Sequence, residues 1–364
     1  MKILILANHF NTLRIFRREL IKKLAENGHE VVISIPACDD ENKAILESYG
    51  SRVIFTDFER RGTNPIKDLS LLREYKRILK SEKPDKVIAY TIKCNIYGAL
   101  ACKKFGIDHY ANVTGLGSSF QSRNLMRSVV SFLYKISLKH SKKVFFENIG
   151  NRDTLVNDRI VDIDKTVVLN GAGVNLEEFC PAPYPDESEP IRFLFVGRIM
   201  REKGVDEYFE AIKRIKKERP EIQFDFIGWY EDNYEDIVNN LQSSGTVNFY
   251  GFQSDVTPFI KRSHCTVLPS WHEGMSNTLL ESAAMCRPLI ASNIHGCKEA
   301  IIENESGFLS EVRNADSLYG ALLRFMSLSY KEKNEMGHKG REFMAQNFDK
   351  NQVVSNTLSQ IFDN

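Results

Sequence analysis

Residues 1–35 read MKILILANHFNTLRIFRRELIKKLAENGHEVVISI, and the fold is inferred first from this stretch. Apolar runs at 3–7 and 31–35 predict two buried strands. Between them, apolar residues recur at helical spacing: Leu13, Phe16, Leu20 and Leu24. Gly28 is suited to cap the end of this helix, because glycine adopts a left-handed backbone without strain. A strand, a helix and a second strand in this order indicate a parallel sheet covered by helices.

The same alternation continues along the chain in two blocks. The first block supplies further strand candidates at 53–56, 87–90, 110–113, 144–146 and 167–169. The second block supplies strand candidates at 193–197, 224–228, 247–250, 265–268 and 289–292. Residues 331–362 have the composition of one continuous helix. Between the blocks, residues 181–190 are acidic and rich in proline, which is typical of a linker.

These patterns predict an α/β protein with two doubly wound, Rossmann-like domains facing a cleft. Ligands of such sheets lie beyond the carboxyl ends of the strands. We expect residues 1–180 to form the first domain, 181–190 the linker and 191–345 the second domain. Residues 346–364 are expected to form a C-terminal helix that packs back toward the first domain.

The composition excludes several classes of protein. No apolar run in the 364 residues approaches the roughly 20 that span a bilayer. The amino terminus favours a buried strand over a signal peptide, because its apolar run is short and no small-residue cleavage site follows. The seven cysteines include no C-x-x-C pair, which favours a reducing cytosol over a zinc site or a disulfide framework.

Charge is distributed unevenly along the chain. Residues 1–170 contain 29 Lys and Arg against 19 Asp and Glu, whereas the remainder contains 20 against 29. Two explanations remain open: one half faces an anionic partner, or the two domains attract each other across the cleft.

The first candidate site lies in residues 269–281, which read PSWHEGMSNTLLE. A strand ends at Pro269, a polar turn follows, and a helix is predicted to begin near Ser276. The amino end of a helix presents unpaired N–H groups and a partial positive charge, which suit a diphosphate. Glu273 in the turn and Glu281 in the helix are then placed to meet sugar hydroxyls on either side. Taken alone, the two glutamates are also compatible with ordinary solvated acids.

The second candidate site lies in residues 193–204, which read FLFVGRIMREKG. Arg198 at the end of the strand offers bidentate donors, and Lys203 adds a positive charge near the next helix. Both lie at the same sheet edge as the Glu273 turn if the sheet is parallel. Such cations stabilise the charge on a departing nucleoside diphosphate in place of a metal ion. The alternative is a solvated basic loop.

Together these two segments resemble the donor site of family 4 glycosyltransferases. The resemblance rests on G-R-x-x-x-x-K-G at 197–204 followed by E-x7-E at 273–281. Residues 170–175 with Phe179 resemble the N-G-V-D-x-x-x-F loop of that family, and residues 250–252 fall where it has its base-binding loop. The resemblance covers essentially the whole chain and implies a GT-B fold and retention of the anomeric configuration of the donor sugar.

Residue roles follow from this resemblance. Arg198 and Lys203 are expected to hold the diphosphate, with Glu273 at the donor sugar, and these three form the expected catalytic set. Glu281 is expected to bind the ribose hydroxyls. The other expected donor contacts are Gly197, Gly228, Phe252, Gly274 and the N–H groups of Ser276 and Asn277.

The resemblance also implies the substrates. It implies a UDP-sugar donor, with a HexNAc such as GalNAc as the sugar, and no metal or other cofactor. The acceptor expected is a polyprenyl-diphosphate-linked saccharide, in bacterial surface polysaccharide synthesis such as that of O-antigen or capsule. The mechanism expected is attack from the face of the leaving group, because no carboxylate nucleophile is evident.

The acceptor is expected to bind the first domain. Loops 90–98 and 112–120 each follow a predicted strand and resemble the subgroup that extends polyprenyl-linked sugars. The expected acceptor-side residues are Lys93, Asn95, Thr114, Gly115, Gly117 and Ser118, together with Asn8 and His9 in the first loop. Many members of the subgroup carry a histidine where this chain has Ile92, so a role for histidine in placing the donor is not implied.

Basic and apolar residues gather around these loops. The basic ones are Arg14, Arg17, Arg18, Lys22, Lys23, Arg123, Arg127, Lys135, Lys139, Lys142 and Lys143. With the apolar residues of 125–136 they predict a helix lying on anionic lipid at the cytoplasmic face of the inner membrane. A helix that faces the core and carries a solvated basic rim explains the same pattern.

Rival functions make different predictions. A nicotinamide-dependent oxidoreductase would carry G-x-G-x-x-G after a strand, and none is present. A metal-dependent transferase would need an acidic motif; Asp162 and Asp164 have D-x-D spacing but are expected in a surface turn. Nucleic-acid binding is disfavoured by the near-neutral charge. Two alternatives stay open: a transferase with another acceptor, and a non-catalytic nucleotide-sugar sensor or scaffold.

Overall fold

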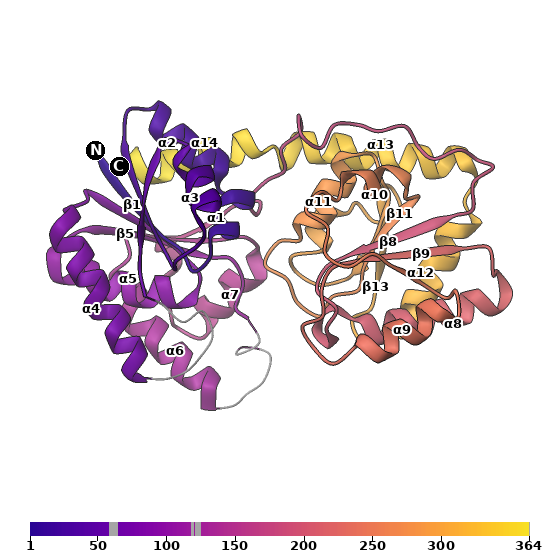
Figure 1. Ribbon diagram of the computed structural model, residues 1–364, viewed down its shortest axis with the longest axis horizontal. Helices are drawn as coiled ribbons and strands as arrows, with labels where there is room; N and C mark the ends of the chain where they lie inside the picture. The colour runs from indigo at the N-terminus through magenta and orange to yellow at the C-terminus, as the bar shows by residue number, and fades with distance from the viewer. Residues whose placement is uncertain (58–64, 118–119, 121–124, 364) are drawn as a thin grey trace. The chain divides into compact units, whose positions relative to one another are not determined.

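The computed structural model describes residues 1–57, 65–117, 120 and 125–363. It divides into two compact units, which are treated separately below (Figure 1). The first unit consists of Met1–Ala172 and Asn351–Asn364, and the second of Gly173–Lys350.

The first unit is built on a parallel sheet with the strand order β3-β2-β1-β4-β5-β6-β7. Its strands are β1 Lys2–Leu6, β2 Glu30–Ile35, β3 Ser51–Phe55, β4 Lys86–Tyr90, β5 Asp108–Val113, β6 Lys143–Phe146 and β7 Thr166–Val168. Its helices are α1 Phe10–Phe16, α2 Arg18–Glu26, α3 Asp40–Glu47, α4 Pro65–Glu82, α5 Ile92–Phe105, α6 Leu125–Leu138, α7 Ile149–Asn157 and α14 Lys350–Phe362.

Helices cover both faces of this sheet, because alternate residues of its strands point to opposite sides. Leu4 and Leu6 of β1 pack with residues of α4, α5 and α6. Ile3 and Ile5 pack with residues of α2, α3 and α14. Figure 1 shows α14, in yellow, among the indigo elements of the first unit. The predicted doubly wound sheet is confirmed for this unit.

The second unit repeats the design with the strand order β10-β9-β8-β11-β12-β13, again parallel. Its strands are β8 Arg192–Val196, β9 Gln223–Ile227, β10 Asn248–Phe249, β11 Cys265–Leu268, β12 Leu289–Ser292 and β13 Gly307–Ser310. Its helices are α8 Val205–Glu218, α9 Glu235–Ser243, α10 Thr257–Arg262, α11 Asn277–Ala284, α12 Ala315–Ser327 and α13 Tyr330–Asn347.

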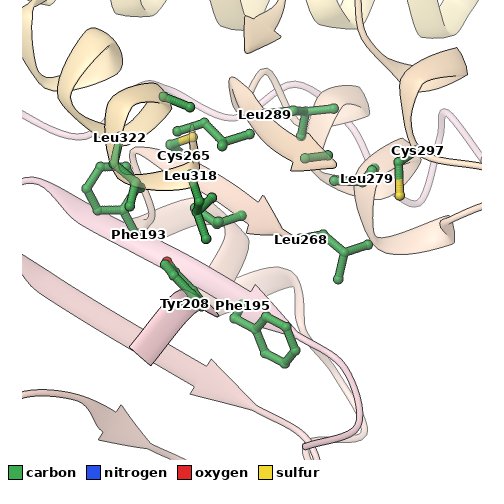
Figure 2. Packing of buried hydrophobic residues seen from close by; sticks show 14 of the residues in the cluster. Phe193, Phe195, Tyr208, Cys265, Leu268, Leu279, Leu289, Cys297, Leu318 and Leu322 are labelled. Atoms are coloured by element: carbon green, nitrogen blue, oxygen red, sulfur yellow. The ribbon is translucent and has the colours of Figure 1, made fainter. Parts of the chain in front are cut away.

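One face of the second sheet packs against the largest core of the unit. Phe193 and Phe195 of β8 belong to this core, together with Tyr208 of α8 and Leu318 of α12 (Figure 2). Leu194, between the two phenylalanines, points to the opposite face. The strand order changes direction between β8 and β11, so the loops after these strands diverge and leave room for a ligand.

Two helices predicted to be continuous are interrupted. The helix predicted between the first two strands is divided into α1 and α2 at Arg17, whose φ is −129°. Arg17 is buried, binds Glu147 at 2.7 Å and lies 4.7 Å from the centre of the Tyr90 ring. The predicted surface role of Arg17 is therefore wrong, because this side chain turns inward to an ion pair. Gly28 does follow α2 with a φ of +79°, as predicted.

The long C-terminal helix is likewise divided, into α13 and α14. At the break, the Val174 N–H donates to Phe348 O at 2.8 Å, and the Lys350 N–H donates to Val174 O at 3.0 Å. These backbone groups pair with a distant segment, so they are unavailable for continuing the helix.

The expected linker at 181–190 begins too late, because the chain enters the second unit at Gly173. Ala182 and Tyr184 are buried in that unit. The Arg287 guanidinium, itself fully buried, donates to the carbonyls of Ala182 and Pro183 at 3.2 and 2.6 Å. Composition predicted a free connection, whereas these hydrogen bonds fix its first half to the second unit.

The described helices include none with the length and apolar character needed to cross a membrane.

Candidate active site

The candidate site of the second unit is formed where the loops after β8 and β11 meet. Gly204 closes the β8 loop with a φ of +71°, and a Cβ at this position would lie 2.0 Å from the carbonyl oxygen of Pro269. The Trp271 N–H donates to Glu202 O at 2.9 Å. Only glycine permits so close an approach, so the sequence holds the two loops together at this point.

The closest charged contact of the site joins these loops. The Lys203 ammonium group binds the Glu273 carboxylate, and the Ser270 hydroxyl donates to the same carboxylate oxygen at 2.7 Å. Burial alone would raise the pKa of Glu273. The positive charge of Lys203 and the hydrogen bonds from Lys203 and Ser270 outweigh it, so the pKa is lowered. Glu273 is therefore ionised and paired with the cation that was predicted to hold a diphosphate.

Further side-chain contacts involve these loops. His272 Nε2 lies 3.1 Å from Glu202 Oε2. The guanidinium groups of Arg201 and Arg313 lie 5.4 and 4.2 Å from the centre of the Trp271 ring. The first two contacts join the loops after β8 and β11 again, and Arg313, which follows β13, packs on the second of them.

The helix predicted near Ser276 is confirmed as α11. Ser276 is its N-cap, and its side chain accepts from the Leu279 N–H at 3.4 Å. Its own N–H donates to Gly296 O at 2.9 Å, so it is not available to a phosphate as predicted. The Asn277 N–H, in the first turn, remains suited to that role. The backbone of Gly274 is closely packed, because a Cβ on Gly296 would lie 2.6 Å from Gly274 O.

Glu281 has an unusual environment for a carboxyl group. It is only partly exposed, and its side chain makes no hydrogen bond or ion pair within the described residues. Burial raises its pKa to about 8, and the charge of Glu178 acts in the same direction, while Lys350 opposes them. Its carboxyl oxygens are open to hydrogen bonds from a ligand, and ionisation on binding would make them stronger acceptors.

Arg198 lies on the other side of the β8 loop. Its Nη1 lies 3.9 Å from Glu231 Oε2, and about a third of its side chain is exposed. Gly197 precedes it, and a Cβ on Gly228 would lie 1.8 Å from Gly197 O. This contact gives Gly197 and Gly228 a backbone-packing role beside the ligand contact expected of them. Phe252 is 65% exposed and its ring lies 5.8 Å from that of Trp229.

The first unit gathers part of the predicted acceptor side. Thr91 follows β4 as the N-cap of α5, and Lys93, in the first turn of α5, binds Asp68 at 2.8 Å. The loop from Thr114 to Gly117 follows β5, and a Cβ on Gly117 would lie 3.6 Å from Ile92. The structure thus brings the beginning of α5 and this loop together at neighbouring strand ends.

Other acceptor-side residues are placed differently. Asn8 lies two residues after the end of β1, and His9 caps α1 by accepting from the Asn11 N–H at 3.2 Å. Asn95 is fully buried, and its amide bonds the Asn112 backbone at 2.8 and 3.2 Å. The acceptor contact predicted for Asn95 does not fit this position, because its polar atoms are used inside the unit. Ser118 lies outside the described residues.

The described part of the chain contains no cluster of three or more His, Cys, Asp or Glu side chains arranged for a metal ion. Asp162 and Asp164 are exposed beside a short 3₁₀ turn, as expected of a surface segment.

Sequence reasoning missed Glu231, Trp229 and Ser270. Ser270 directly follows Pro269 in the segment already singled out, so its position was the available signal. Trp229 and Glu231 follow Gly228 at the carboxyl end of β9, and polar or aromatic residues after a parallel strand deserve the same weight there as after β8.

The second unit therefore combines two cations, a helix amino end and two carboxyl groups at the switch in strand order. Cations and helix N–H groups bind phosphate oxygens, and carboxylates bind hydroxyl groups. Such a site fits a ligand that carries both.

Two family models match the chain. The model described as glycosyl transferases group 1 matches residues 179–343. The model described as glycosyl transferase 4-like matches residues 2–148.

Several curated proteins are similar over most of their length. One from Campylobacter jejuni is 29% identical, covering 83% of each chain, and is named N,N'-diacetylbacillosaminyl-diphospho-undecaprenol alpha-1,3-N-acetylgalactosaminyltransferase. One from Escherichia coli is 30% identical, covering 75% of this chain and 74% of its own. Its name is UDP-Gal:alpha-D-GlcNAc-diphosphoundecaprenol alpha-1,3-galactosyltransferase.

Solved structures share the fold over the whole chain. HepE from Anabaena, in complex with UDP and glucose, is 15% identical with a TM-score of 0.79 over 99% of both chains. Sucrose-phosphate synthase from Thermosynechococcus elongatus is 18% identical with a TM-score of 0.79, over 100% of this chain and 98% of its own.

Proposed function

The chain belongs to the glycosyltransferases defined by the group 1 and 4-like models and has the GT-B fold, and we propose that it moves a sugar from a UDP-sugar to a polyprenyl-diphosphate-linked saccharide. The observation that carries the proposal is the contact of Lys203 with Glu273 where the loops after β8 and β11 meet, with Arg198 in the first of these loops and Glu281 in the helix that follows the second. UDP as the nucleotide is supported by the HepE complex, and the acceptor class by the names of the Campylobacter and Escherichia relatives.

The roles proposed for the residues follow from their chemistry. Arg198 and Lys203 bind the diphosphate and stabilise the charge that grows on it as the sugar departs, without a metal ion. Lys203 exchanges its bond to Glu273 for the phosphate, which frees the Glu273 carboxylate for the hydroxyls of the donor sugar. Glu281 accepts from the ribose hydroxyls, and the Asn277 N–H adds a donor at the phosphates.

The reaction proposed retains the anomeric configuration. The bond between the anomeric carbon and the β-phosphate oxygen breaks, and a bond to the acceptor oxygen forms on the same face. The acceptor proton passes to the β-phosphate oxygen, and UDP leaves. NMR assignment of the product anomer tests retention, and trapping of a covalent glycosyl-enzyme in Glu273→Gln would replace this route by a double displacement.

The deciding experiment measures UDP release by the purified protein with a panel of UDP-sugars, with and without a polyprenyl-diphosphate-linked HexNAc. We expect acceptor-dependent release with one donor, with GalNAc as the first candidate sugar. Glu281→Ala and Lys203→Ala should each abolish it, whereas Glu210→Ala and Lys213→Ala, on the exposed face of α8, should not. UDP binding without release from any pair would favour another acceptor or a non-catalytic sensor. Loss of release in EDTA would overturn the metal-independent mechanism.

A membrane contact through α6 is proposed as part of this function, because a polyprenyl-linked acceptor lies in a bilayer. Val129 and Phe132 are 46% and 62% exposed, and Lys135 and Lys139 are exposed on the same helix or just beyond it. Arg127, also predicted for this surface, binds Asp158 at 2.9 Å, and Arg123 lies outside the described residues. The surface is thus an apolar strip with lysines beside it, which suits anionic lipid.

Flotation with vesicles that contain phosphatidylglycerol tests this contact. Phe132→Asp should release the protein from the vesicles, whereas Phe105→Asp, a substitution of another exposed phenylalanine of the same unit, should not. Equal flotation of Phe132→Asp and the unaltered protein would remove the membrane contact and leave the transferase reaction untouched.

A further inference from the structure

The loop after β9 carries a carboxylate that contacts the arginine of the candidate site. Glu231 Oε2 lies 3.9 Å from Arg198 Nη1 and accepts a hydrogen bond from Trp229 Nε1 at 3.3 Å. The Glu231 side chain is 14% exposed, against 35% for Arg198. One largely buried oxygen therefore faces both a guanidinium and an indole.

The backbone fixes this arrangement. Beyond the ends of β8 and β9, the Ile199 N–H donates to Trp229 O at 2.8 Å, and the Glu231 N–H donates to Ile199 O at 3.1 Å. Gly228 permits the approach, because any Cβ there would overlap Gly197 O. The pairing of the two segments therefore continues past the sheet and sets Glu231 across from Arg198.

The indole that Glu231 binds is exposed beside a second aromatic ring. Trp229 is 48% exposed and forms a T-shaped contact with Phe252, which is 65% exposed. The Gly228 N–H donates to Gly251 O at 2.9 Å, which brings the two loops together. Two large aromatic side chains exposed side by side are suited to pack against a planar ring such as a nucleobase.

We propose that Glu231 is a positioning residue that orients Arg198 toward the donor diphosphate and Trp229 toward the base of the same nucleotide. The inference rests on the proposed function and deepens it, because it joins the phosphate and base contacts through one carboxylate. A guanidinium fixed on one side by a carboxylate loses less rotational freedom when it binds phosphate with its other N–H groups.

The sign of one substitution separates this role from simple electrostatics. Glu231→Gln removes a negative charge near an anionic ligand, so a purely electrostatic effect would tighten UDP binding. Loss of positioning should instead weaken it, by about tenfold. Glu235→Gln removes the same charge from an exposed position four residues on and should leave UDP affinity unchanged or slightly tighter.

A double-mutant cycle identifies the route of the effect. UDP affinity is measured by calorimetry for Arg198→Ala, Glu231→Gln and the combination. Because Glu231 is proposed to act partly through Arg198, Glu231→Gln should cost less once Arg198 is absent, and the loss that remains is the part that acts through Trp229. Additive losses, or tighter binding by Glu231→Gln, would overturn the inference and leave the proposed function in place.

The fluorescence emission of Trp229 in the folded protein gives a readout that does not depend on the free energy of unfolding. The chain has two tryptophans, so Trp271→Phe leaves Trp229 as the only one. UDP should change its emission, and Glu231→Gln should alter the emission before UDP is added. If neither UDP nor Glu231→Gln changes the emission of Trp229, the proposed link between Glu231 and the indole is contradicted. If UDP fails to bind the unaltered protein at all, the proposed function is overturned, and this inference with it.

Discussion

At the scale of single residues, the protonation of Glu281 is the property with the clearest consequence. Burial and the charge of Glu178 raise its pKa to about 8, so the group is largely protonated at neutral pH when no ligand is bound. If the ionised carboxylate binds ribose hydroxyls, UDP binding releases a proton. Affinity should then rise with pH, by up to about tenfold per pH unit below the pKa, and level off above it.

Calorimetry of UDP binding between pH 6 and 9 checks this prediction. Glu281→Gln should flatten the profile, apart from any titration of UDP itself, and Glu210→Gln should not change it. An unaltered slope in Glu281→Gln would show that another group takes up the proton.

The same shift affects the stability of the unliganded protein. The pKa of Glu281 in the folded state exceeds its usual value of 4.5, so between these values the folded state binds more protons than the unfolded state. The contribution of this group to the free energy of unfolding should therefore fall as pH rises from about 4.5 toward 8. Urea unfolding at both ends of this range, compared with Glu281→Gln, measures it.

The sequence predicted the loops and the helix in which the candidate site residues of the second unit lie but not how those residues pair. Strand ends and motif spacing are local features, and from them Arg198 and Lys203 were expected after β8, Glu273 in the turn after β11 and Glu281 in the helix that follows, where the structure has them. The bond between Lys203 and Glu273 joins residues 70 positions apart. It depends on how closely two loops approach, which is set by Gly204 and Pro269 and not by either motif.

At the scale of elements, the loop between β8 and α8 depends on the absence of a side chain at Gly204, where it packs against Pro269. A Cβ there would lie 2.0 Å from Pro269 O, in a backbone with φ +71°. Gly204→Ala should therefore destabilise the protein by about 3 kcal/mol or more and displace Lys203, weakening UDP binding. Gly245→Ala is the matched control, because its φ is +68° but no atom lies within 4 Å. It should cost only the backbone strain, about 1 kcal/mol.

Thermal unfolding and UDP binding of both variants measure these effects. Equal destabilisation by the two substitutions would mean that the loop moves away from Pro269 at little cost.

Strands defined by apolar runs were predicted well. Helix ends that depend on tertiary contacts were predicted poorly. The strands predicted in both blocks are present, although β13 (Gly307–Ser310) was not predicted. The helix breaks at Arg17 and at Phe348 were also missed. In each case the apolar pattern continues, while an ion pair or a backbone hydrogen bond to a distant segment interrupts the helix.

At the scale of the whole molecule, the chain leaves the first unit after Ala172 and returns to it at Asn351. Composition indicated a linker at 181–190, but Arg287 ties the beginning of that segment to the second unit. Arg341 also donates to the carbonyls of Leu176 and Phe179, at 3.2 and 2.8 Å. A buried arginine that binds only carbonyl groups is not evident from sequence, because its partners carry no side-chain signature.

The return of the chain makes the first unit depend on its last helix. Ile361 of α14 is 1% exposed in the core that contains Ile3 and Ile5, and its carbonyl accepts from the Tyr110 hydroxyl at 3.1 Å. Ile361→Ala should cost about 2–5 kcal/mol through the cavity that it leaves. Because the residues proposed to bind UDP all lie in the second unit, UDP affinity should not change.

Hydrogen exchange followed by mass spectrometry tests this prediction, because it measures amide exchange separately in each unit. Exchange should accelerate in β1, β2 and β4 and stay the same in β8 and β11. Ile163→Ala is the matched control, because it removes the same atoms from a side chain that is 51% exposed in the first unit. Unchanged exchange in the first unit would mean that α14 contributes little to its core. Faster exchange in both units, with weaker UDP binding, would mean that they unfold together, since a loss confined to one core reaches the other only through cooperative unfolding.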